Sequence, residues 1–148
     1  MFVIKKITQE HISQLCALEE SLFDSDNYPI SKRAFRYHIK KNNLILGAFE
    51  KGSLIGYSLV FNYKKSARIY SIAIDKNHQR KGIGQKILQE IIYIVRENKI
   101  NNIFLEVRID NVNAINAYKK NGFKELKRLQ NYYLDGADGI KMELCLED

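Results

Sequence analysis

Residues 68–84 read RIYSIAIDKNHQRKGIG, and this stretch decides the fold. Its apolar first half, rich in isoleucine, predicts a strand over Arg68–Asp75. From Gly82 to Asn98 the apolar residues recur at helical spacing, which predicts a long helix. A further apolar run predicts a strand over Asn102–Ile109. Strand, helix and strand form a βαβ unit, so the two strands should be parallel.

The rest of the chain follows the same two periodicities. Strands are expected over residues 2–7, 44–49, 54–63, 123–133 and 140–146. Helices are expected after Thr8 and after Ser31, either of which can cap a helix, and over residues 113–121. The sequence therefore predicts an α/β fold with a mixed α+β sheet. It should have about seven strands and four helices in a single domain, residues 1–148.

Composition excludes several classes of protein. Of the 148 residues, 45% are hydrophobic and 28% are charged, a globular mixture rather than a disordered one. No apolar run approaches the ~20 residues of a membrane-spanning helix. The short apolar start does not have the form of a signal peptide, so a cytoplasmic protein is expected. A net charge of +7 suits an anionic ligand or partner, although the basic residues are dispersed.

Cysteine and histidine point away from disulfides and metals. Cys16 and Cys145 are far apart in sequence and are expected to be free thiols in the core. The three histidines form no metal-binding spacing with either cysteine. We therefore expect neither a structural nor a catalytic metal.

The segment Gln79–Gly84 can hold a phosphate group. It lies between a predicted strand and a predicted helix, where glycines let the backbone approach a ligand and N–H groups converge. Arg80 and Lys81 can add charge-assisted contacts. The glycine spacing is neither the dinucleotide fingerprint nor a P-loop, so an ordinary turn before a helix remains an alternative.

Glu106 and Tyr118 are candidate catalytic residues, each with a structural alternative. Glu106 interrupts an apolar strand, so it either forms an ion pair with Arg108 on the same strand face or serves as a general base. Tyr118 shares a helix face with Ala114 and Ile115. It is therefore either a core tyrosine or the donor of a proton to a leaving group.

Taken in order, these segments resemble the GNAT superfamily of N-acetyltransferases. The motif Gln/Arg-x-x-Gly-x-Gly/Ala is matched by Gln79, Gly82 and Gly84. The expected element order, β-α-α-β-β-β-α-β-α-β-β, covers the whole chain. The RimI-type ribosomal-protein alanine N-acetyltransferases are the most similar group, on the residues Leu105-Glu106-Val107-Arg108, Asn111, Ala114-Ile115, Tyr118, Gly122-Phe123 and Asn131-Tyr132-Tyr133.

The resemblance implies acetyl-CoA as cofactor and a direct transfer mechanism. It implies cofactor contacts from Ile72, Ala73, Ile74, Gln79, Arg80, Lys81, Gly82, Ile83, Gly84 and Asn111. In this family pattern, Glu106 takes a proton from the substrate ammonium through water, and Tyr118 protonates the departing thiolate. The acceptor site would be formed by Tyr28, Pro29, Ile30, Tyr132 and Tyr133. RimI-like chains often carry an aromatic residue after the proline, where this chain has Ile30.

The implied function is acetyl transfer to a protein N-terminal α-amine, possibly on a ribosomal protein. Acetylation of lysine side chains, polyamines or another small amine is the alternative. A non-catalytic CoA-binding or ribosome-binding module is a further alternative, which the presence of both Glu106 and Tyr118 disfavours. We expect a monomer or weak dimer that needs neither a membrane nor direct contact with nucleic acid.

Overall fold

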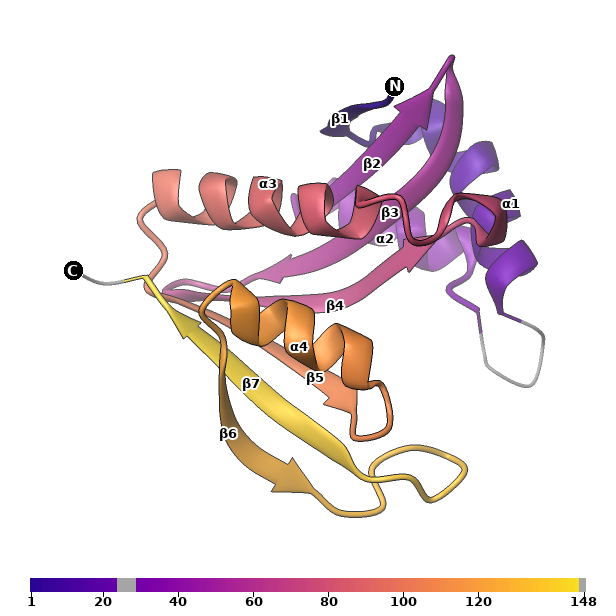
Figure 1. The fold of residues 1–148 in the computed structure, drawn as a ribbon. Helices are drawn as coiled ribbons and strands as arrows, with labels where there is room; N and C mark the ends of the chain where they lie inside the picture. The colour runs from indigo at the N-terminus through magenta and orange to yellow at the C-terminus, as the bar shows by residue number, and fades with distance from the viewer. Residues whose placement is uncertain (24–28, 147–148) are drawn as a thin grey trace.

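The computed structural model describes residues 1–23 and 29–146 and contains one seven-stranded sheet (Figure 1). Its strand order is β1-β2-β3-β4-β5-β7-β6. The strands are β1 (Val3–Lys6), β2 (Leu44–Glu50), β3 (Ser53–Asn62), β4 (Ser66–Ile74), β5 (Asn102–Arg108), β6 (Lys124–Leu129) and β7 (Gly139–Cys145). This confirms the predicted mixed α/β fold and its order of elements.

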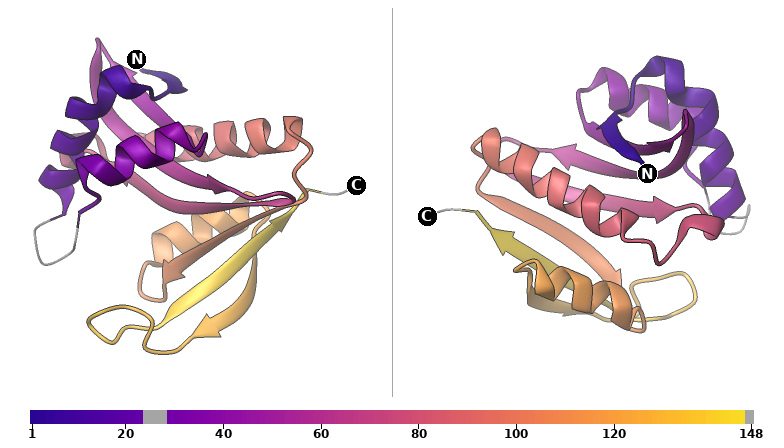
Figure 2. Two further views of the ribbon diagram at one scale, coloured as in Figure 1. Left: turned by 180° about the vertical axis from the view of Figure 1, so that it is seen from behind. Right: turned by 45° about the horizontal axis from the view of Figure 1, so that its top comes forward.

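Four α-helices cover the sheet unevenly. They are α1 (Ile12–Leu22), α2 (Lys32–Lys40), α3 (Ile83–Glu97) and α4 (Val112–Lys120). Figure 2 shows α3 and α4 on one face, while α1 and α2 lie on the opposite face over the N-terminal strands. On that opposite face, no helix formed by residues 1–23 or 29–146 covers β5, β7 and β6.

The apolar core forms one layer on each side of the sheet. Under α3 and α4, a cluster includes Ile87, Ile91 and Ile115. Under α1 and α2, a second cluster includes Leu15 and Phe35, both fully buried. Burial of such side chains contributes roughly 1.5–3 kcal/mol each. Within the described residues, no helix is long and apolar enough to cross a membrane.

Two helix ends carry signals that are visible in the sequence, and the cap predicted at Ser31 is confirmed. The Ser31 hydroxyl accepts a hydrogen bond from Ala34 N at 3.1 Å and caps α2. Gly122 follows α4 with φ of 98°, a left-handed conformation that glycine adopts without strain. The helix expected directly after Thr8 instead begins with a 3₁₀ turn, Gln9–His11.

Two expectations need correction. The strand predicted over residues 123–133 ends at Leu129, because the chain turns there into a loop held by Asp138. Both cysteines are free thiols, as predicted, but neither lies in the buried core. Cys16 is half-buried against the cluster under α1 and α2, and Cys145 is exposed because it alternates with buried Leu144 and so lies on the other face of β7.

The βαβ unit pairs its strands only at one end. β4 and β5 are parallel, as predicted, but their pairing ends at Ile69 opposite Leu105, while both strands continue. The two strands diverge from that point (Figure 1). At the same position β4 contains a bulge, since Tyr70 has no partner between Ile69 and Ser71 in the pairing with β3. A bulge bends its strand, which accounts for the gap.

Candidate functional site

The gap between β4 and β5 exposes one backbone edge of β4. Asp75 N donates to Ile55 O on β3 at 2.8 Å, and Ser71 O accepts from Ser58 Oγ on β3 at 2.7 Å. Successive residues of a strand turn their polar groups to opposite edges. The N–H groups of Ile72 and Ile74 therefore face the gap, where β5 no longer pairs with β4.

The segment between β4 and α3 is built as an open backbone turn. The Gln79 side chain donates to Ile74 O at 3.1 Å and so ties the turn to the end of β4. Gly82 caps α3 with φ of 80°, and a Cβ placed there would meet no atom within 4 Å. Arg80 also has a positive φ of 65°, and both Arg80 and Lys81 are exposed. The start of α3 is thus open to a ligand.

A histidine holds the turn that precedes this segment. His78 Nδ1 lies 2.8 Å from Asp75 Oδ2, and His78 Nε2 lies 3.3 Å from Glu50 Oε1. The bond with Asp75 raises the pKa of His78 and lowers the pKa of Asp75. Sequence inspection did not single out His78. Asp75 is close to it in sequence, but Glu50 of β2 becomes its neighbour only in the folded sheet.

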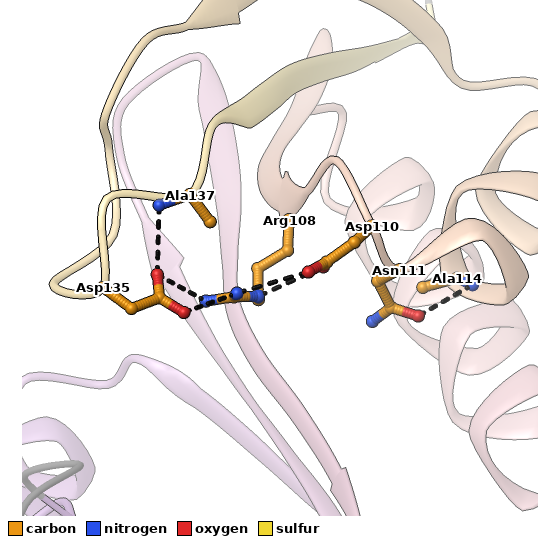
Figure 3. A network of polar contacts seen from close by, with 6 residues as sticks. All are labelled: Arg108, Asp110, Asn111, Ala114, Asp135 and Ala137. Carbon is orange, nitrogen blue, oxygen red and sulfur yellow. Dashed lines mark hydrogen bonds and ion pairs between the residues drawn. The ribbon is translucent and has the colours of Figure 1, made fainter.

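Two of the predicted cofactor residues have buried side chains, and the backbone of Ala73 pairs with Tyr57 on β3, so it does not face the gap. Ala73 and Ile83 are buried, with 6% and 3% of their surface exposed, because their side chains pack into the two core layers. By contrast, Ile72, Gly84 and Asn111 line a cavity of about 250 Å³ between the gap and α4. The Asn111 side chain also accepts from Ala114 N at 3.3 Å and caps α4 (Figure 3).

Glu106 forms an ion pair with Arg68 and not with Arg108, the partner named in the structural alternative for this residue. Arg68 Nε and Nη2 lie 2.7 and 2.5 Å from Glu106 Oε1. The other carboxylate oxygen of Glu106, Oε2, accepts no hydrogen bond from the described residues. Glu106 lines a cavity of about 190 Å³ at the gap, together with Ile72, Asn111 and Tyr118. The structure thus gathers both candidate catalytic side chains around one space.

Tyr118 faces the same gap from α4. Its ring packs against Phe123 with centroids 5.7 Å apart. Its hydroxyl has no hydrogen bond with the described residues. Burial raises the pKa of Tyr118 to about 12, and the neighbouring Tyr133 adds to the shift. The phenol therefore keeps its proton well above neutral pH.

A second cavity of about 290 Å³ lies on the α1/α2 side of the gap. Its walls are formed by Glu19, Phe23, Ile30, Arg68, Tyr70, Ser71, Glu106, Tyr132 and Tyr133. Among the predicted acceptor residues it contains Ile30, Tyr132 and Tyr133, and Glu106 lines both this cavity and the one at the gap. Pro29 is half-buried and does not line this cavity, and Tyr28 lies outside the described residues.

Arg108 secures the loop that carries the two tyrosines. Its guanidinium group bonds Asp110 on one side, at 3.2 Å, and Asp135 on the other, at 2.8 Å (Figure 3). It also lies over the Tyr133 ring, 5.1 Å from the ring centroid. Arg108 therefore binds the loop between β6 and β7, and the ion pair of Glu106 is formed with Arg68 instead.

Comparison with known proteins gives a consistent set of similarities. The model of the Acetyltransferase (GNAT) family matches residues 10–123. The chain is similar to N-alpha-acetyltransferase RimI of Mycobacterium tuberculosis, with 31% identity over 137 residues, 88% of this chain and 84% of that protein. An N-alpha-acetyltransferase of Sulfurisphaera tokodaii is 43% identical over 79 residues, 53% of this chain and 47% of that protein.

The solved structures extend the similarity to the whole fold. A ribosomal-protein alanine N-acetyltransferase from Escherichia coli superimposes with a TM-score of 0.90 at 25% identity, over 100% of this chain and 96% of that chain. Several curated relatives are longer: the chain spans 47% of the Sulfurisphaera tokodaii protein, and 29% and 40% of two others.

Proposed function

The chain belongs to the GNAT family of acetyltransferases, and we propose that it transfers the acetyl group of acetyl-CoA to the α-amino group at a protein N-terminus. One observation carries the proposal. Glu106, Tyr118 and the free backbone edge of β4 surround a single gap, with a separate cavity on each side of it. One cavity suits the cofactor and the other suits the acceptor.

The cofactor would bind along the loop and the gap. Its pyrophosphate oxygens would accept hydrogen bonds from the backbone N–H groups of residues 79–84. The positive end of the α3 dipole would further stabilise their negative charge. Its pantetheine arm would lie along the edge of β4 and bond Ile72, with Ile74 N–H near the thioester oxygen. Asn111 lines the cavity where this arm would pass, and its amide nitrogen makes no bond with the described residues.

The reaction would proceed by direct attack of the amine. Glu106 accepts a proton from the ammonium group through water, and the neutral nitrogen attacks the thioester carbonyl. A C–N bond forms and the C–S bond breaks, and Tyr118 gives its proton to the departing thiolate. Holding both reactants at the gap supplies part of the acceleration, and donors to the oxyanion supply another part.

The acceptor side suits a peptide chain. No helix of the described residues covers the face of β5, β7 and β6 next to the acceptor cavity, and this face could take the residues that follow an N-terminus (Figure 2). Tyr132 and Tyr133 stand at this rim with their rings 5.0 Å apart. A ribosomal protein as acceptor, a cytoplasmic location and a monomeric or weakly dimeric state stay predictions.

The test of function is CoA release across a panel of acceptors. The panel contains peptides with different N-terminal residues, the same peptides with a blocked N-terminus and an internal lysine, and polyamines. We expect turnover with free N-termini only. Faster turnover with lysine peptides or polyamines would instead support the alternative function, acetylation of lysine side chains or small amines.

The phosphate-binding role of Gly82 gives a prediction of its own. Gly82→Val should weaken CoA binding roughly 10- to 100-fold in calorimetric titration, because the new side chain keeps phosphate from the backbone N–H groups. Gly52→Val is a matched control, since Gly52 has nearly the same φ, 83°, and equally open surroundings. Both variants carry the same backbone strain. Equal CoA affinity in the two variants would show that the phosphate does not bind at this loop.

A further inference from the structure

Glu19 is a buried acid on the wall of the acceptor cavity. Only 3% of its surface is exposed, on the inner side of α1. Its Oε1 accepts from the Tyr57 hydroxyl, and its Oε2 accepts from Ile30 N at 2.7 Å. Both oxygens act as acceptors, as in an ionised carboxylate.

The charge of Glu19 is not balanced by a cation of the described residues. Glu106, the other acid of this cavity, is balanced by Arg68. Among the described residues, the three charged side chains of the cavity therefore carry a formal net charge of −1, from two carboxylates and one guanidinium group. A buried charge without a counter-ion is costly, so the site is suited to a ligand that brings a positive charge.

Ser71 is a second, independent sign of a polar ligand at this wall. Its Oγ is the one buried side-chain polar atom without a hydrogen-bond partner among the described residues. Ser71 lines both the acceptor cavity and the cavity at the gap. The Tyr57 phenol is near enough for Ser71 to influence its pKa, but the two groups lack the geometry of a hydrogen bond.

We propose that Glu19 is the counter-charge that selects a protonated amine in the acceptor cavity. The inference rests on the proposed function, and it gives Glu19 and Glu106 different roles. Glu19 attracts the ammonium group, holds Ile30 in the cavity wall and accepts a hydrogen bond from Tyr57 in the core behind it. Glu106, through its free oxygen, then takes the proton. Glu19 thus determines which acceptor binds, and its loss should act on acceptor affinity rather than on the chemical step.

The test compares two peptides that differ in one group. One begins with alanine, and the other has an α-hydroxyl group in place of the α-amino group. Their affinities for the CoA-saturated protein are measured near pH 6, where a free α-amine is charged. The wild type should prefer the amine. Glu19→Gln should reduce that preference on the order of tenfold, raise the acceptor KM and leave CoA affinity unchanged.

Glutamine suits the test because it fits the same hydrogen bonds without the charge. Its amide oxygen can accept from Ile30 N, and its amide nitrogen can donate to the Tyr57 oxygen once that hydroxyl turns. Tyr57→Phe is the structural control, since it removes one bond and keeps the charge of Glu19. That variant should lose stability and keep the preference for the amine.

Arg68→Met changes the charge in the opposite direction. It leaves two unbalanced carboxylates in the cavity, so the preference for the amine should rise. If Glu19→Gln does not fold, this variant tests the premise that the net charge of the cavity governs the preference. An unchanged preference in folded Glu19→Gln would overturn the role of Glu19, and an unchanged preference in Arg68→Met would overturn the premise on which that role rests. If neither peptide bound the wild type, the proposed peptide acceptor itself would be wrong, and the inference would fall with it.

Discussion

Glu106→Gln should lower kcat by a factor on the order of 10²–10⁴, the range expected when general-base assistance is lost. Glutamine keeps the size of the side chain, and its oxygen can still accept the bonds of Arg68. It cannot take a proton from the acceptor. The loss should shrink as pH rises, because an increasing fraction of the acceptor amine is then neutral. Steady-state kinetics from pH 6 to pH 10 give the measurement.

Glu143→Gln is the matched control for this prediction. Glu143 lies opposite Phe104 on the neighbouring strand β7, on the face without a helix, and accepts from Asn102 Nδ2 at 2.8 Å. The chemical change is the same, but Glu143 lines neither of the cavities at the gap. The control should keep the wild-type kcat. Full activity in Glu106→Gln would mean that Glu106 has only a structural role, as the ion-pair partner of Arg68.

Tyr118→Phe should lower kcat on the order of 10²-fold or more while the melting temperature changes little. The phenol has no hydrogen bond to lose among the described residues, and phenylalanine keeps the packing on Phe123. Affinity for acetyl-CoA should also stay close to that of the wild type. Turnover and melting temperature measured on one preparation separate catalysis from packing.

The raised pKa of Tyr118 adds a condition on pH. Because burial shifts this pKa upward to about 12, the phenol holds its proton at every pH below that value. Wild-type activity should therefore show no alkaline decline from Tyr118 up to about pH 10. A variant that melts earlier yet turns over at the full rate would instead make Tyr118 a packing residue.

Much of the fold was predictable because its signals are local. The change of apolar period near Gly82 marks the step from strand to helix, and Ser31 and Gly122 mark helix ends through their own backbone and side-chain chemistry. The βαβ unit follows from order alone. Glu106 and Tyr118 could be singled out because a charge or a hydroxyl on an apolar face needs an explanation.

The partners of these residues could not be predicted in the same way. Alternation along β5 placed Arg108 beside Glu106, but the observed partner, Arg68, comes from β4 and depends on strand pairing. Glu19 carried a weaker signal. It lies four residues after Leu15, on the buried face of α1, and this period could have marked it as a buried acid. Its bonds to Tyr57 and Ile30 are visible only in the folded chain.

The unpaired residue in β4 has a consequence for how such a site diversifies. After Tyr70 the alternation of side chains starts afresh, so Arg68 and Ser71 both line the acceptor cavity, whereas Ile72 lines the cofactor cavity. Neighbouring positions on one strand therefore line the proposed binding sites of different reactants. Substitution at position 68 or 71 changes a wall of the acceptor cavity, whereas substitution at position 72 changes a wall of the cofactor cavity, so the bulge lets adjacent positions of one strand shape two different binding sites.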